Sequence, residues 1–213
     1  TEDGSLVVES PHFRMVAETR IGRQDLTRFA RVVESVPQLI KSHPLRLWNS
    51  PRKSITDIIL CKDETSFVKA GGDERAVGWW DGHKERVLIR SDYFLAPPQT
   101  ENSRLQAQPD EGLLVHELVH ASMSASLWRL PPWFTEGIAE YFSVCHQGGG
   151  WYLFRDLDSL IRNHLRRAIS RNKVGEHFHL VPVPSILALS HQDWIKVSQS
   201  QPGGNAYLSY ATA

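Results

Sequence analysis

The segment Leu113–Ser122, which reads L-L-V-H-E-L-V-H-A-S, decides how the fold of this chain is interpreted. His116 and His120 are four residues apart, so on an α-helix their side chains share one face and can bind the same metal ion. Glu117 follows the first histidine and projects toward the coordination position that is left for water. This H-E-x-x-H arrangement predicts a zinc-binding helix that carries its own general base.

A second helix follows after a short connection and supplies two more carboxylates. Pro131-Pro132 predicts its start, and its apolar pattern runs to about Val144. Glu136 and Glu140 are one turn apart on it, and burying them is costly unless a metal or an imidazole compensates their charge. We predict that Glu136 is the third metal ligand. Glu140 is predicted to accept a hydrogen bond from the other ring nitrogen of a ligand histidine.

These residues together predict a hydrolase with one zinc ion. Zinc lowers the pKa of a water molecule at the open position toward about 7. Glu117 would take the proton from that water as it attacks a carbonyl, and would deliver it to the leaving amine. A further donor should stabilise the oxyanion, and the downstream candidates are Tyr207, Tyr210 and His191.

The order of the elements predicts an α+β fold, with a small mixed sheet packed on the H-E-x-x-H helix and a mainly helical C-terminal half. We expect a single domain over 1–213, with an α/β part at about 1–110 and a helical part at about 111–213. The expected strands are 6–10 with 13–16, broken near Pro11, then 55–61, 77–80 and 86–89. The expected helices are 24–42, kinked or divided at Pro37, then 62–70, 111–126 with Asp110 as N-cap, 132–144 closed by 148–150, 156–170, 193–198 and one from 206. This last helix reaches the end at 213 after a few residues, which leaves open whether the domain is truncated there.

The composition is that of an ordinary globular protein. The 213 residues are 41% hydrophobic and 23% charged, and the 24 basic and 24 acidic side chains cancel, so no net charge favours nucleic acid as a partner. No apolar stretch approaches the roughly 18–20 residues that span a bilayer, so no membrane span is expected. Cys61 and Cys145 could form a disulfide or remain as two buried thiols.

Two segments, Leu114–His120 and Pro132–Tyr141, resemble the gluzincin zinc metallopeptidases, and most closely the peptidase MA-like family. Two weaker similarities lie at Val8–Phe13, which looks like the first strand of that family, and at Ala206–Ala211, which looks like a helix that carries a transition-state tyrosine in related aminopeptidases. The resemblance implies a zincin-like fold. It implies that the metal ligands are His116, His120 and Glu136, that the base is Glu117, that Glu140 supports a ligand, and that Tyr207, or else Tyr210, is the oxyanion donor.

The resemblance also implies a peptide or protein substrate. The substrate would pair with an edge strand, for which Val77–Trp80 or Arg86–Arg90 could serve. An extracytoplasmic bacterial location is favoured on the same ground. One departure from the family is that only fifteen residues separate His120 from Glu136, fewer than in thermolysin-like or aminopeptidase relatives.

Two alternatives remain open at the level of sequence. The first is a binding module in which the zinc fold presents a surface without turning over substrate, although a purely structural site has no use for Glu117 as a base. The second is a zinc hydrolase that acts on a non-peptide amide. Cleavage specificity and oligomeric state cannot be inferred from these residues.

Overall fold

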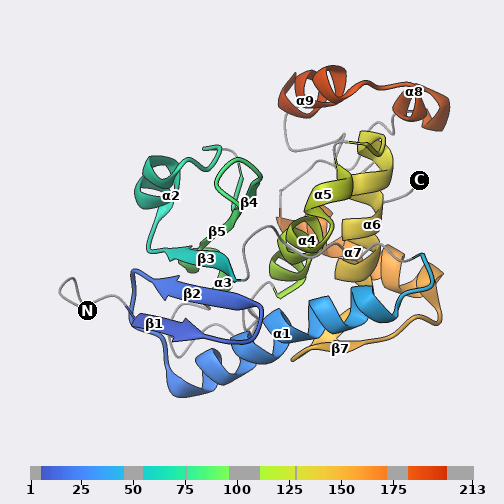
Figure 1. The fold of residues 1–213 in the computed structure, drawn as a ribbon. Helices are drawn as coiled ribbons and strands as arrows, with labels where there is room; N and C mark the ends of the chain where they lie inside the picture. Colours follow the sequence, from blue (N-terminus) through green and yellow to red (C-terminus); the bar gives the residue numbers. More distant parts are fainter. Residues whose placement is uncertain are drawn as a thin grey trace.

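The computed structural model describes residues 6–45, 55–74, 76–95, 111–127, 129–171 and 182–200. They form an α+β fold in which a five-stranded mixed sheet packs against helices (Figure 1). The strands are β1 (Leu6–Glu9), β2 (Phe13–Ala17), β3 (Thr56–Cys61), β4 (Gly78–Asp81) and β5 (Arg86–Arg90), in the order β1-β2-β3-β5-β4. β2, β3 and β5 are parallel, whereas the two edge strands, β1 and β4, are antiparallel to their neighbours.

The two faces of the sheet are covered by different helices because side chains alternate along each strand. Ile58 on β3 and Val87 on β5 face the main core, which they share with α1 (Arg23–Ser42) and α4 (Glu111–Ser122). Leu88 points to the opposite face and packs against Phe67 of α2 (Glu64–Ala70). The central strands are therefore buried on both faces, as expected for parallel strands.

Helix α4 is buried along nearly its whole length, because α1, α6 (Pro132–Cys145) and strands β4 and β5 enclose it. Leu114, Val115, Leu118 and Val119 are fully buried, which explains why the helix is apolar on every side. The polar side chains of α4 are consequently buried as well, and each must find a partner inside the protein.

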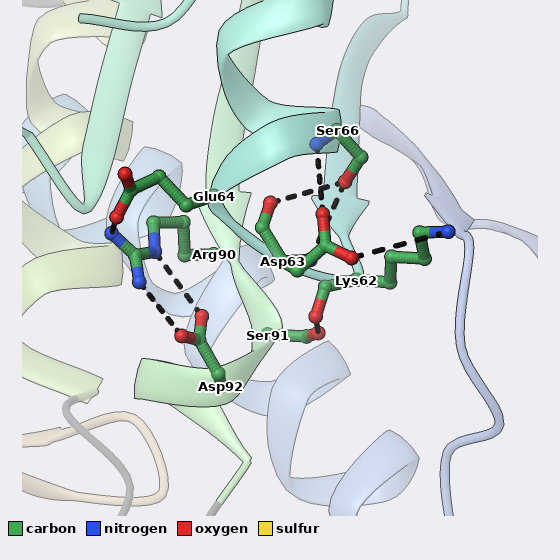
Figure 2. Close-up of polar contacts among 7 residues, drawn as sticks. All are labelled: Lys62, Asp63, Glu64, Ser66, Arg90, Ser91 and Asp92. Carbon is green, nitrogen blue, oxygen red and sulfur yellow. Dashed lines mark hydrogen bonds and ion pairs between the residues drawn. The ribbon is translucent and has the colours of Figure 1, made fainter. Parts of the chain in front are cut away.

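Hydrogen bonds and ion pairs tie together the carboxyl ends of β3 and β5 (Figure 2). Asp63 caps α2 by accepting a hydrogen bond from the backbone N–H of Ser66 at 2.8 Å. Arg90, at the end of β5, pairs with Glu64 at 2.9 Å and with Asp92 at 2.8 Å. These contacts fix β5 beside β3, and β5 in turn positions the edge strand β4.

The first predicted strand is two strands. Ser10 and Phe13 close a tight turn around Pro11, with Ser10 N donating to the Phe13 carbonyl at 2.8 Å, so β1 and β2 pair as a hairpin. Pro37 does not divide α1, which continues to Ser42. The buried face that includes Val33, Val36 and Ile40 holds this helix in place, and its packing outweighs the hydrogen bond that proline cannot donate.

The predicted helix over 111–126 is interrupted at Met123. The N–H of Met123 is shared between the carbonyls of Val119 and His120, a bifurcated bond common at helix ends, and α5 (Ser124–Leu127) follows. Gly148–Gly150 were expected only to close α6. Instead their positive φ angles turn the chain into a hairpin of β6 (His146–Gly148) and β7 (Trp151–Tyr152).

Arg86–Arg90 is wrong as a candidate edge strand, because it forms β5 between β3 and β4. The remaining helices are α3 (Ser91–Phe94), α7 (Leu157–Arg171), α8 (Val183–Leu187) and α9 (His191–Ser200), the last extending the segment expected at 193–198. The predicted cap Asp110 and the segment 206–213 lie outside the described residues.

Cys61 and Cys145 are free, buried thiols, and burial raises the pKa of each to about 11. Both are therefore protonated and unreactive at neutral pH. Within the described ranges, no helix combines the length and the apolar character that crossing a membrane requires.

Candidate metal centre

His116, His120 and Glu136 form a buried triad that could hold a metal ion. The two histidines come from α4 and the glutamate from α6, which packs beside α4 (Figure 1). The Nε2 atoms of the histidines are 3.0 Å apart, and Oε2 of Glu136 lies 3.3 Å from Nε2 of His116 and 3.5 Å from Nε2 of His120. The side chain of Glu136 is 25% exposed, so solvent reaches the triad from this side.

The spacing of the three ligand atoms suits a tetrahedral zinc ion. Bonds of about 2.0–2.1 Å at tetrahedral angles place neighbouring ligand atoms about 3.3–3.4 Å apart. The observed separations of 3.0, 3.3 and 3.5 Å bracket this value. Two imidazole nitrogens and one carboxylate oxygen are also a donor set that zinc accepts. The residues present therefore fit the metal that the sequence predicts.

Glu140 supports the triad from the next turn of α6. Its Oε1 lies 3.0 Å from Nδ1 of His116, and its side chain is 5% exposed. A carboxylate at this place accepts the Nδ1 proton of His116 and leaves the lone pair of Nε2 directed at the triad. The contact lies where the sequence predicted it, and it restricts the orientation of the His116 ring.

The electrostatics of the triad favour positive charge. Burial alone lowers the pKa of His116, but the contacts with Glu136 and Glu140 outweigh it and hold this pKa well above the ordinary value. Burial opposes the ionisation of Glu136, yet His120 and His116 keep its pKa well below the usual range. The imidazoles thus stabilise the anionic form of Glu136, and the carboxylates stabilise positive charge beside them.

Glu117 lies beside the triad, although it is not one of its members. Its side chain is buried and its carboxylate accepts a hydrogen bond from the backbone N–H of Trp80 on β4. Burial raises the pKa of Glu117, while the charges of His116 and His120 act in the opposite direction. A raised pKa suits a group that must both accept and release a proton.

Strand β4 passes very close to Glu117. A Cβ atom built on Gly78 would lie 2.9 Å from Cγ of Glu117, so only glycine allows this approach. The N–H of Arg90 donates to the carbonyl of Val77, and antiparallel pairs alternate between bonded and unbonded, so the N–H of Trp80 points away from β5. The free edge of the sheet therefore faces the carboxylate.

A second polar cluster lies at the start of the same helix. This anchor cluster consists of Glu111, Arg28, His146 and the backbone of Gly149–Gly150. Oε1 of Glu111 lies 2.6 Å from Nε of Arg28, and its Oε2 accepts from the N–H of Gly149 at 2.7 Å. Nε2 of His146 accepts from the N–H of Gly150 at 3.1 Å. Burial lowers the pKa of His146, although the charge of Glu111 opposes this.

Of the three predicted oxyanion donors, the described residues include only His191. Tyr207 and Tyr210 lie outside the described residues. His191 is exposed at the first turn of α9.

Two groups that contact the carboxylates of the site were not predicted from the sequence. One is the N–H of Trp80, a backbone group that no side-chain pattern reveals. The other is His164 of α7, whose Nε2 lies 3.5 Å from Oε2 of Glu140. The sequence could have indicated this contact, because a histidine at an apolar position of a helix needs a polar partner.

No family model matches this chain, and no curated protein is similar to it in sequence. The description of the site therefore rests on the geometry of the triad.

Proposed function

We propose that this protein is a zinc-dependent peptidase in which Glu117 is the general base. The observation that supports this most directly is the placement of a second carboxylate, that of the buried Glu117, against a triad that already contains two imidazoles and one carboxylate. A site that only stabilises the fold has no need of an additional buried base. The triad and Glu117 together are the minimal set for hydrolysis of an amide bond.

The roles follow from the contacts. His116, His120 and Glu136 would hold the zinc ion, which when bound supplies a Lewis acid for the substrate carbonyl and increases the acidity of water. Glu140 keeps the Nδ1 proton on His116, so that Nε2 faces the triad. Glu117 accepts the proton of the attacking water at its carboxylate and delivers it to the leaving nitrogen. The N–H of Trp80 holds the carboxylate in place for both steps.

The substrate would bind along β4. Among the described strands, Gly78–Asp81 pair with β5 alone, so the backbone groups on their other side that Glu117 does not use can accept an extended peptide by strand addition. This edge runs past Glu117, where Gly78 makes its close approach. A bond in a peptide held there would lie near both the base and the triad.

The zincin-like fold and gluzincin character belong to this proposal, and so does the oxyanion donor. Tyr207 is proposed for that role, and Tyr210 as the alternative. The motif resemblance further suggests membership of the peptidase MA-like family, an extracytoplasmic bacterial location and a single domain over 1–213. A Tyr207→Phe variant that cleaves about 100-fold more slowly than wild type would support the first tyrosine.

The proposal is tested by cleavage of a mixed peptide library. Wild type, Glu117→Gln and the control Glu34→Gln are compared at equal zinc content, measured by mass spectrometry of the metal. We expect wild type and Glu34→Gln to cut. Glu117→Gln should retain zinc but lose roughly 10²–10⁴-fold in rate, the range of general base catalysis.

Two outcomes would contradict the proposal in different ways. If wild type carries zinc and cuts no peptide, the protein is better described as a binding module or as a hydrolase of another amide. If Glu117→Gln cuts as fast as wild type, another group is the base.

A further inference from the structure

His164 stands out on α7 because its position calls for an apolar side chain. Among the side chains of α7 that the structure describes, residues 157–164, those that are partly buried are Leu157, Leu160, Ile161 and His164, and the others are exposed. This spacing of i, i+3, i+4 and i+7 is the core-facing stripe of an amphipathic helix. The first three members are aliphatic, and His164 alone is polar.

The partner of His164 lies on α6, against which α7 packs. Nε2 of His164 is 3.5 Å from Oε2 of Glu140, whose Oε1 is 3.0 Å from Nδ1 of His116. Glu140 is 5% exposed, whereas His164 is 30% exposed. The buried carboxylate therefore lies between an imidazole of the triad and an imidazole of α7.

Burying the carboxylate of Glu140 is costly, and each polar group that contacts it lowers this cost. The imidazole of His164, 3.5 Å from its other oxygen, is a polar neighbour that lowers the cost of the buried charge and restricts the rotation of the carboxylate. Glu140 then remains an acceptor for the Nδ1 proton of His116, and the lone pair of His116 Nε2 stays directed at the triad.

We propose that His164 is a positioning residue for the metal site, acting through Glu140 on His116. The inference rests on the proposed zinc site. It adds a residue of α7, a helix that contributes none of the three proposed ligands. It also explains why α7 carries a histidine at a core-facing position.

The test measures zinc affinity by competition with a chromophoric chelator. His164→Leu restores an apolar stripe and keeps the helix amphipathic, so the fold should persist. We expect its zinc affinity to fall by about tenfold, the lower end of the range for groups that orient a metal ligand. His164→Gln retains an N–H donor at a similar reach and should stay within about twofold of wild type.

Two further measurements separate positioning from packing. In a Glu140→Gln background, His164→Leu should cause no additional loss of affinity, because its effect passes through Glu140. The absorption spectrum of the cobalt-loaded protein should change in His164→Leu and not in His164→Gln. Arg162→Gln, on the exposed face of the same helix, is the control and should match wild type.

The outcomes distinguish this inference from the proposed function. If wild type takes up no zinc, both the proposed site and the role of His164 are wrong. If wild type binds zinc and His164→Leu binds it equally well, only the role of His164 is overturned. An equal loss in His164→Leu and His164→Gln, or an additive loss in the double variant, would also overturn it.

Discussion

The triad and the anchor cluster each include residues of the same buried helix, α4, and both combine histidine with glutamate, yet their atoms are paired differently. In the anchor cluster each acceptor faces a donor: Glu111 meets Arg28 and the N–H of Gly149, and His146 accepts from the N–H of Gly150. In the triad, by contrast, two imidazole nitrogens and a carboxylate oxygen converge on one point.

This difference separates a structural polar cluster from a candidate binding site. The anchor cluster is held by an ion pair and by backbone hydrogen bonds within the chain, and it ties the start of α4 to α1 and to the β6–β7 hairpin. The triad directs several lone pairs to one place, an arrangement that a cation completes. Substitutions in the two clusters should therefore affect different properties, namely metal binding in one and stability in the other.

The largest effect is expected from Glu136→Ala. Removing one of three ligands should reduce zinc from one ion per chain to a trace, because two imidazoles alone hold zinc weakly. Metal analysis after dialysis is the measurement. Glu34→Gln is the matched control and should retain zinc. It changes a carboxylate on α1 that is paired with His12. Unchanged zinc in Glu136→Ala would mean that the third ligand has been assigned wrongly.

Glu140→Gln should have a smaller effect of the same kind. The amide accepts the Nδ1 proton of His116 less strongly than a carboxylate does, so zinc affinity should fall by about 10–100-fold. Competition titration with a chelator measures this loss. A variant that binds zinc as tightly as wild type would show that the contact at 3.0 Å does not orient the ring.

Glu111→Ala should lower the stability of the fold and leave zinc binding unchanged. Without the carboxylate, Arg28 and the N–H of Gly149 lose their acceptor, and the free energy of unfolding should fall by about 2 kcal/mol. Urea unfolding of the metal-free protein gives this number, and metal analysis should still find one zinc ion per folded chain. If zinc is lost while the fold persists, the two clusters are not separate.

The smallest effect is expected from His146→Gln, and it depends on pH. The pKa of His146 in the folded protein is below its value in the unfolded chain, so its contribution to stability is complete above about pH 6.5 and is lost as the pH falls through the folded pKa. Glutamine keeps an acceptor for the N–H of Gly150 and does not titrate. The free energy of unfolding of the metal-free variant should therefore fall less steeply than that of wild type as the pH is lowered. The difference in slope corresponds to at most about one proton taken up on unfolding. Equal slopes would contradict a neutral, buried His146.

Local sequence patterns predicted the parts of the site that lie within single helices. α6 begins and ends within one residue of expectation, because its bounds follow from helical spacing and from Pro131-Pro132. The placement of Glu136 and Glu140 on the same side of α6 could be inferred because residues four apart share a helix face. The backbone donor at Trp80 and the placement of His164 against Glu140 could not be inferred, since both depend on how separate elements pack.

The same limit applies to the fold. The segments that form the five strands were expected to be extended, but the order β1-β2-β3-β5-β4 depends on long-range pairing, and only that order shows that Gly78–Asp81 form an edge. The β6–β7 hairpin was missed because three glycines signal the end of a helix as readily as a tight turn. Pro37 remained inside α1 because buried packing along that helix outweighed a local signal.

The most direct test of the account is a crystal structure of the protein grown with zinc, with anomalous data collected at the zinc edge. We predict one strong anomalous peak per chain, at about 2.0–2.1 Å from Nε2 of His116 and Nε2 of His120 and at about 2.0–2.2 Å from a carboxylate oxygen of Glu136. A zinc-soaked protein with no peak between these three atoms, or with zinc held only elsewhere on the chain, would contradict the account.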